Sequence, residues 1–248
     1  MQTDISVLVI EDEETWARKI TYDLDQFGFN VVDCIDTLED ALPAIRANNF
    51  DIALLDINLS GKNSGIELGR IINETVKKPF IFITGTINDS ILEETASTRP
   101  SAFLTKPFNP ASLYISIQSA IHHFSAGKPA LFPRDAAAVT DCFFVKLGNK
   151  YTRIDWQDVV CLRSERNYTG IITGDNANCV IRSSLQRTMQ YIIPEGLRPN
   201  FIQINRGEVL NTKFIKGLVG DEAITDYQSF SITDGFVKNL KQHLNILS

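Results

Sequence analysis

The chain has 248 residues, with 44% hydrophobic and 22% charged residues and a formal net charge of -6. These values are ordinary for globular proteins, and the length suggests two domains. No stretch is long and apolar enough to span a bilayer, and the start lacks the basic region and apolar core of a signal peptide. We therefore expect a cytoplasmic protein without a membrane partner.

In the first half, short apolar runs each end in a reactive polar side chain. The runs are only four or five residues long, which is typical of buried parallel strands. Amphipathic stretches separate them, so the pattern predicts an α/β fold with a doubly wound, five-stranded parallel sheet. The polar residues at the ends of the runs are Glu11, Asp12, Asp56, Thr84 and Lys106.

The carboxyl ends of parallel strands share one edge of a sheet, where ligands gather. Three carboxylates meeting there repel one another unless a cation lies between them, and Mg²⁺ suits oxygen ligands. Asp56 could then attack a phosphorus centre as a nucleophile, with Thr84 donating to a phosphoryl oxygen and Lys106 pairing with another. The pattern therefore predicts a phosphoryl-transfer site.

The first amphipathic stretch follows Glu13 and Glu14. Its apolar residues Trp16, Ile20 and Leu24 recur at helical spacing. This spacing places Trp16 on the buried face of a helix, and we expect it to be a core residue rather than a site residue.

Residues 1–124 resemble the receiver domain of two-component response regulators, which has a flavodoxin-like fold. The resemblance implies phosphorylation of Asp56 by a sensor histidine kinase and a magnesium site formed by Glu11, Asp12, Asp56 and the main-chain carbonyl of Asn58. It also implies a switch in which Phe103 turns inward as Thr84 moves onto the phosphoryl group, and a cis peptide bond before Pro107. Each of these two roles has an alternative. Phe103 could be an ordinary core residue rather than a switch, and the domain could be a degenerate receiver that serves only for docking. The motifs are Glu11-Asp12, Asp56, Asn58, Thr84-Gly85 and Lys106-Pro107.

Composition shifts after residue 124, and residues 125–138 form the predicted linker to a second domain over residues 139–248. Residues 1–125 carry 9 basic and 18 acidic residues, a net charge of -9, whereas residues 126–248 carry 15 and 12, a net charge of +3. The basic excess points weakly to a polyanion partner for the second half. The four cysteines are scattered, with no spacing typical of a zinc site.

The second half changes to short alternating runs separated by turns, and so predicts a smaller, mainly β domain. It resembles a LytTR-type DNA-binding domain, which inserts loops into DNA grooves. The stretches that carry this resemblance are 144–154, 156–159, 165–168, 184–185, 201–206, 209–211 and 214–215.

The resemblance places candidate DNA contacts in the loops of this second domain. Three positions depart from the family, because Gln203, Asn205 and Gly207 stand where Arg, His and Ser are usual. In addition, Thr233-Asp234 replaces a Ser-Arg pair, and an Asp is unfavourable near phosphates. Each candidate could equally be a solvated surface residue. The candidates are Arg166, Asn167, Arg182, Arg187, Asn205 and Arg206.

The sequence as a whole predicts a response regulator whose phosphorylation favours a homodimer and binding to double-stranded DNA. A different class of function is a signalling adaptor whose second half binds protein. We expect no enzymatic output beyond phosphotransfer to Asp56 itself, because the second half shows no nucleophile–base pair.

Overall fold

The computed structural model describes residues 2–61, 64–85, 91, 94–95, 97–127, 142–148, 150–174 and 178–244. The chain divides into two compact units. The first comprises Met1–Thr140 and Phe144–Thr152, and the second comprises Asp141–Phe143 and Arg153–Ser248.

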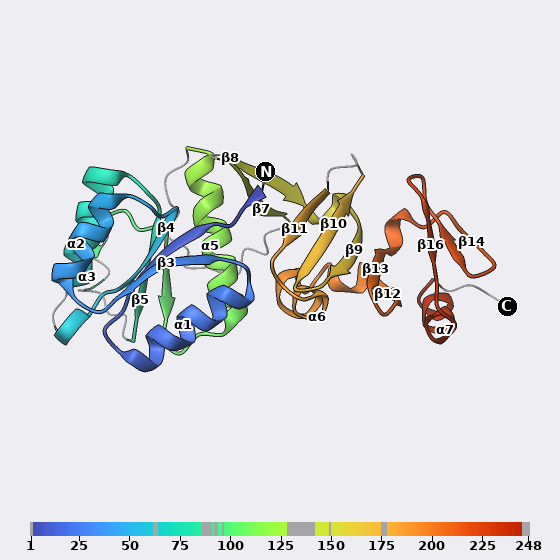
Figure 1. Cartoon of the computed structure of the whole chain (residues 1–248), viewed down its shortest axis with the longest axis horizontal. Helices are drawn as coiled ribbons and strands as arrows, with labels where there is room; N and C mark the ends of the chain where they lie inside the picture. The colour runs from blue at the N-terminus through green and yellow to red at the C-terminus, as the bar shows by residue number, and fades with distance from the viewer. Residues whose placement is uncertain are drawn as a thin grey trace. The chain divides into compact units, whose positions relative to one another are not determined.

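The first unit contains the predicted five-stranded parallel sheet (Figure 1). The order β3-β2-β4-β5-β6 is that of a doubly wound flavodoxin-like fold, so the fold class is confirmed. Every described residue of β4 and β5 is buried, because helices cover both faces of such a sheet. The strands are β2 (Ser6–Ile10), β3 (Asn30–Ile35), β4 (Ile52–Asp56), β5 (Phe80–Thr84) and β6 (Ala102–Thr105).

Helices follow the strands of this sheet in alternation. The helix α1 begins at Glu14, two residues after the acidic pair. The helix α5 begins at Pro110, and the side chain of Asn109 accepts a hydrogen bond from the Ser112 N–H. The core on one face of the sheet joins β4 and β5 to the buried sides of α2 and α3. The helical bounds are α1 (Glu14–Gln26), α2 (Leu38–Ala47), a 3₁₀ turn (Leu59–Gly61), α3 (Ser64–Ile71), a π-helical turn (Ile72–Val76) and α5 (Pro110–Ser125).

A small sheet of order β1-β7-β8 pairs the start of the chain with two strands that follow the predicted linker. It consists of β1 (Gln2–Thr3), β7 (Cys142–Leu147) and β8 (Lys150–Asp155). The Lys146 ammonium lies 2.6 Å from the Asp51 carboxylate, which also accepts the Ser6 N–H at 2.8 Å. Residues 144–152 thus cluster with the first unit, although they belong to the predicted domain 139–248. The boundaries 1–124, 125–138 and 139–248 stay predictions, and linker residues 128–138 lie outside the described residues.

The second unit is mainly β, as predicted, with an antiparallel five-stranded sheet of order β11-β10-β9-β13-β12 and a three-stranded sheet of order β14-β15-β16. Only α7 (Asp234–His243) exceeds one helical turn among the α-helices described here; α6 (Leu185–Arg187) continues as a π-helical turn (Thr188–Ile192). The strands are β9 (Val159–Glu165), β10 (Tyr168–Thr173), β11 (Asn178–Ile181), β12 (Phe201–Asn205), β13 (Glu208–Asn211), β14 (Gly217–Val219), β15 (Glu222–Ile224) and β16 (Ser229–Ser231). The 3₁₀ turns are Trp156–Asp158, Arg198–Asn200 and Thr212–Phe214.

A shared core joins the two sheets of the second unit to α7. Ile204 of β12 and Leu240 of α7 are fully buried in it, together with Phe230 of β16. This packing fixes the start of α7 beside the end of β12, where the Thr233 N–H donates to the Ile204 carbonyl. Among the described residues, no helix is both long enough and apolar enough to cross a membrane.

Candidate functional site

The carboxyl edge of the parallel sheet brings together the polar residues that the sequence singles out. Asp56 is the last residue of β4 and Thr84 the last of β5, while Lys106 follows β6 and the acidic pair follows β2. Neighbouring strands are in register at this edge, since Asp56 pairs with Ile83 and Thr84 with Thr105. The peptide bond between Lys106 and Pro107 is cis, as the resemblance implies.

The Lys106 ammonium lies between two buried carboxylates. Its Nζ is 2.6 Å from Asp56 Oδ2 and 2.7 Å from Glu11 Oε1. Only 9% of the Lys106 side chain, 9% of the Asp56 side chain and 1% of the Glu11 side chain are exposed. Charges so far removed from water need partners, and the ammonium partly offsets the repulsion between the two carboxylates.

Burial changes the acid–base properties of this cluster. Desolvation raises the pKa of Glu11 to about 7, a hydrogen bond from Lys106 opposes the rise, and the charge of Asp56 adds to it. Burial by itself would lower the pKa of Lys106, but hydrogen bonds and charges from Asp56 and Glu11 raise it overall. Lys106 is therefore a permanent cation at neutral pH, whereas Glu11 exchanges its proton in that range.

Three carboxylates offer ligand atoms that all lie within 4.8 Å of one another: Glu11, Asp12 and Asp56. Asp12 is exposed, and one of its oxygens accepts the Ser60 N–H at 2.7 Å. The Asn58 N–H donates to Asp56 Oδ1 at 2.8 Å. This hydrogen bond keeps the turn that follows β4 next to the Asp56 carboxylate. A cluster of hard oxygen donors open to solvent on one side fits Mg²⁺, which keeps several of its waters when bound to proteins.

The predicted switch residues lie on adjacent strands. Thr84 is 3% exposed at the end of β5, and its carbonyl accepts the Lys106 N–H at 2.7 Å. Phe103 on β6 is partly buried, with its ring centroid 5.6 Å from that of Phe82. Their roles as a switch stay a prediction.

Trp16 was expected in the core, but it lies beside the site. Its ring is only partly buried, and Lys106 Nζ is 5.4 Å from the ring centroid. Helical periodicity correctly placed Trp16 on the inward face of α1, yet it could not tell that this end of the helix faces the carboxyl edge of the sheet.

In the second unit, four of the six candidate DNA contacts lie in turns at one end of the five-stranded sheet, whereas Asn205 is the last residue of β12 and Arg187 the last of α6. The turn at Arg166-Asn167 joins β9 to β10, and the turn at Arg206-Gly207 joins β12 to β13. Strands β9 and β13 are antiparallel neighbours, and the Ser164 N–H donates to the Gly207 carbonyl at 2.7 Å, so the two turns lie side by side. We call this end, with its two turns, the turn end of the sheet.

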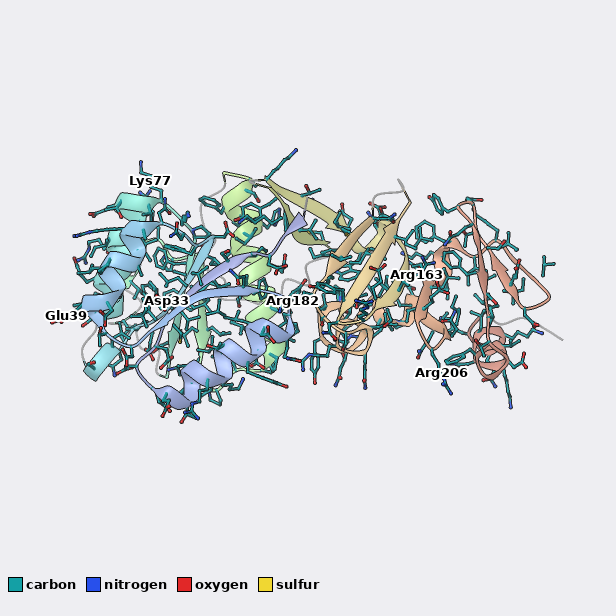
Figure 2. All side chains as sticks on the ribbon, viewed as in Figure 1. Asp33, Glu39, Lys77, Arg163, Arg182 and Arg206 are labelled. Carbon is teal, nitrogen blue, oxygen red and sulfur yellow. The ribbon has the colours of Figure 1, made fainter. Side chains whose placement is uncertain are left out.

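Arg182 belongs to the same end, because Ile181 pairs with Thr169 at the start of β10. Arg166, Asn167, Arg182 and Arg206 are all exposed, and Figure 2 labels Arg182 and Arg206. Arg166 has a positive φ of 59°, as its tight turn requires.

Two further candidates have contacts within the unit. Asn205 donates to Glu208 Oε2 at 2.7 Å and to the Ser231 carbonyl at 3.2 Å, and it accepts the Gly207 N–H at 2.9 Å. The Arg187 guanidinium lies over the Tyr191 ring, 5.6 Å from its centroid. These contacts give Asn205 a structural role in shaping the turn.

Acidic side chains also reach the turn end. Glu208 lies 2.8 Å from the Arg163 guanidinium, and Glu165 precedes the β9–β10 turn. Asp234 begins α7, whose first turn is held next to β12. The turn end therefore mixes charges of both signs.

Comparison with known proteins agrees with this geometry. Residues 7–118 match the family model of the response regulator receiver domain. The chain is 27% identical over 221 residues to the transcriptional regulatory protein LytR of Staphylococcus aureus strain N315, a match that covers 86% of this chain and 85% of LytR. It is 30% identical over 115 residues to the transcriptional regulatory protein YvrH of Bacillus subtilis, covering 46% of this chain and 48% of YvrH.

Among solved structures, the chain is similar to the signal receiver domain of a modulated diguanylate cyclase from Desulfovibrio desulfuricans G20. The identity is 28% and the TM-score 0.48, and the match covers 51% of this chain and all of that domain.

The fold, the carboxylate cluster and the family match at residues 7–118 agree in identifying a response regulator receiver domain in the first unit. Beyond this domain, the chain is similar to the transcriptional regulatory protein LytR over most of its length.

Proposed function

We propose that this protein is a phosphorylation-dependent regulator of transcription, which accepts a phosphoryl group on Asp56 and binds double-stranded DNA through its second unit. The observation that carries the proposal is the contact of the Asp56 carboxylate with Lys106 at 2.6 Å, beside two further carboxylates at the carboxyl edge of the sheet. This is the set of groups that phosphoryl transfer to a carboxylate needs.

In the proposed reaction, a carboxylate oxygen of Asp56 forms a bond to phosphorus while the phosphorus–nitrogen bond of a kinase phosphohistidine breaks. The departing imidazole nitrogen keeps the bonding electron pair and takes up a proton. Bound Mg²⁺ would neutralise part of the phosphoryl charge, and Glu11, Asp12, Asp56 and the Asn58 carbonyl would hold it. Lys106 remains at the site as a second cation and pairs with a phosphoryl oxygen.

Activation would begin with Thr84, whose hydroxyl moves onto the new phosphoryl oxygens. The space that it leaves lets Phe103 turn inward, and the population shifts towards a receiver that pairs with a second copy. The face formed by the fourth and fifth helices is the expected dimer surface; α5 is described, but most of the preceding segment at residues 86–96 lies outside the described residues. Sedimentation should show a larger mass for the phosphorylated protein at concentrations where the unmodified protein is a monomer.

DNA would meet the turn end of the second unit, which offers Arg166, Asn167, Arg182 and Arg206 from separate turns. Arginine side chains can pair with phosphates or with guanine edges. Dimerisation would then combine two modest half-site affinities through the raised effective concentration of the second domain.

The phosphoacceptor assignment is tested by incubating the full chain with acetyl phosphate and Mg²⁺ and measuring intact mass. Wild type should gain one phosphoryl group, Asp56→Asn should gain none, and Asp12→Ala should be labelled more slowly because it loses a metal ligand. Equal labelling of wild type and Asp56→Asn would remove Asp56 from the role.

A second candidate function is an adaptor whose second unit binds protein. The acidic residues Glu208 and Asp234 near the turn end favour it, because they reduce the attraction for phosphates. Binding of duplex DNA that weakens steeply with salt would support the DNA reading, since released counterions make phosphate contacts salt-dependent. No DNA binding at low salt would favour the adaptor.

A further inference from the structure

An aromatic pair lies on the α1 side of the Lys106 ammonium, and one of its two rings faces that ammonium. The pair consists of Trp16 on α1 and Phe108, which follows Lys106 by two residues, and their ring centroids are 5.3 Å apart with an interplanar angle of 34°. Lys106 Nζ is 5.4 Å from the centroid of the Trp16 ring. The ring belongs to a different element from Lys106, so the contact is tertiary rather than local.

A second cation, the Lys19 ammonium of α1, contacts both rings of the same aromatic pair. Lys19 Nζ lies 5.0 Å from the Phe108 centroid and 5.8 Å from the Trp16 centroid. Lys19 is itself held by Asp23, one turn further along the helix, at 2.7 Å, and the Asp23 side chain is only 6% exposed. The aromatic pair is thus fixed to α1 at both rings.

An indole face attracts an ammonium group electrostatically and is the best aromatic partner for it. It accepts no strong hydrogen bond, so it does not compete with the oxygens of Asp56, Glu11 or an incoming phosphoryl group for the N–H donors of Lys106. A lysine side chain otherwise moves readily into water, because its compact ammonium is strongly hydrated and its stem is flexible. The Lys106 side chain is nevertheless only 9% exposed, although Thr105 and Pro107 on either side of it are exposed.

We propose that Trp16 is a positioning residue for phosphoryl transfer: its indole face, braced by Phe108 and Lys19, holds the Lys106 ammonium at the Asp56 carboxylate. This inference rests on the proposed phosphorylation of Asp56 and names a residue that the receiver motif does not contain. Trp16 touches no reacting atom; it acts through Lys106.

The first test measures the initial rate of phosphorylation of the full chain by acetyl phosphate at saturating Mg²⁺. Trp16→Leu should lower the rate by about threefold to tenfold, which is the range of a partly desolvated cation–π contact. Trp16→Phe keeps an aromatic face and should recover most of the rate. Tyr22→Leu is the matched control, because Tyr22 lies on the same helix and is 60% exposed, and its rate should equal that of wild type.

The second test separates positioning from a general structural effect by a double-mutant cycle with Lys106→Met. If Trp16 acts through Lys106, Trp16→Leu should change the rate far less in the Lys106→Met background than in wild type. Equal losses in both backgrounds would overturn the proposal, as would a wild-type rate for Trp16→Leu.

A direct readout covers the case in which Lys106→Met is too slow to measure. The ring current of Trp16 should shift the proton resonances next to Lys106 Nζ in the NMR spectrum, and Trp16→Leu should remove this shift while Tyr22→Leu preserves it. Unchanged Lys106 resonances in Trp16→Leu would contradict the contact. If wild type is not phosphorylated, or if Asp56→Asn is phosphorylated to the same extent as wild type, the proposed function itself fails. If wild type is phosphorylated at Asp56 but Trp16→Leu has the same rate as wild type, only the positioning role of Trp16 fails.

Discussion

The proposed phosphoacceptor site and the turn end assemble their candidate side chains in different ways. At the phosphoacceptor site, charged side chains from three strand ends are buried and pair with one another, with Lys106 Nζ within 2.7 Å of both Glu11 and Asp56. At the turn end, the arginines are exposed, and the sheet and core beneath them set their positions. A substitution at the first site should therefore leave a buried charge without its partner, whereas removal of an exposed arginine at the turn end should not.

The largest effect should come from removing both arginines of the adjacent turns. Each contact with DNA should be worth about 1–3 kcal/mol, so Arg166→Ala and Arg206→Ala together should weaken duplex binding more than either single substitution. Fluorescence anisotropy with a labelled duplex measures this. Lys213→Ala is the matched control, because Lys213 is exposed in the 3₁₀ turn that follows β13, at the opposite end of the strand. An equal loss in Lys213→Ala would mean that the turn end has no special role.

The next effect concerns the hairpin of residues 144–152. Lys146→Met leaves the partly buried Asp51 without its ammonium partner and should lower the free energy of unfolding of the first unit by about 1–3 kcal/mol. Hydrogen exchange of the β2 and β4 amides would report it, and Lys150→Met, at an exposed position of the same hairpin, should have little effect. Unchanged hydrogen-exchange protection in Lys146→Met would show that this ion pair does not stabilise the first unit.

The phosphoacceptor site should also respond to pH. Burial raises the pKa of Glu11 to about 7, so the carboxyl is increasingly protonated below that pH, and protons compete with Mg²⁺. Calorimetric titration should show the Mg²⁺ dissociation constant rising as the pH falls below 7, approaching about tenfold per pH unit. Glu11→Gln should bind Mg²⁺ more weakly and lose most of this pH dependence. A constant affinity between pH 8 and 6 in wild type would contradict the account.

The smallest effect should come from the acidic side of the turn end. Glu208→Gln removes a negative charge near Arg206 and should tighten DNA binding by about twofold to fivefold, with less than about 1 kcal/mol change in stability, because its pair with Arg163 is partly exposed. Glu195→Gln, an exposed position on the segment before β12, is the control. Weaker DNA binding by Glu208→Gln would show that its pairing with Arg163 and Asn205 matters more than its charge.

The two regions also differ in how far the sequence predicts them. The phosphoacceptor site follows from strands that each end in one polar residue, because a parallel βα repeat brings all such ends to one edge. The turn end depends on β9 and β13 being neighbours, and alternation of apolar residues shows where strands are but not which of them pair. The sequence thus predicts Arg166 and Arg206 as candidate DNA contacts, but only the observed strand order places their turns side by side.

Trp16 and Asn205 show how single residues can differ from the role that a sequence pattern predicts. Periodicity put Trp16 on the inward face of α1 and so suggested core, yet the helix end faces Lys106. Asn205 was chosen as a DNA contact from its place in a motif, whereas its amide is hydrogen-bonded to Glu208, Gly207 and Ser231. Long-range packing decides the surroundings of Trp16. The bonds of Asn205 to Gly207 and Glu208 are local to the turn, as is common for Asn side chains in turns, and only its bond to Ser231 depends on the tertiary fold.

The most direct test of the central claim measures duplex binding by the full chain with and without acetyl phosphate and Mg²⁺, using a duplex selected from a random pool. Phosphorylation should tighten binding by about tenfold or more in wild type, because dimerisation raises the effective concentration of the second DNA-binding unit. Asp56→Asn should show the same affinity under both conditions. Equal tightening in Asp56→Asn, or no tightening in phosphorylated wild type, would contradict control of DNA binding by Asp56.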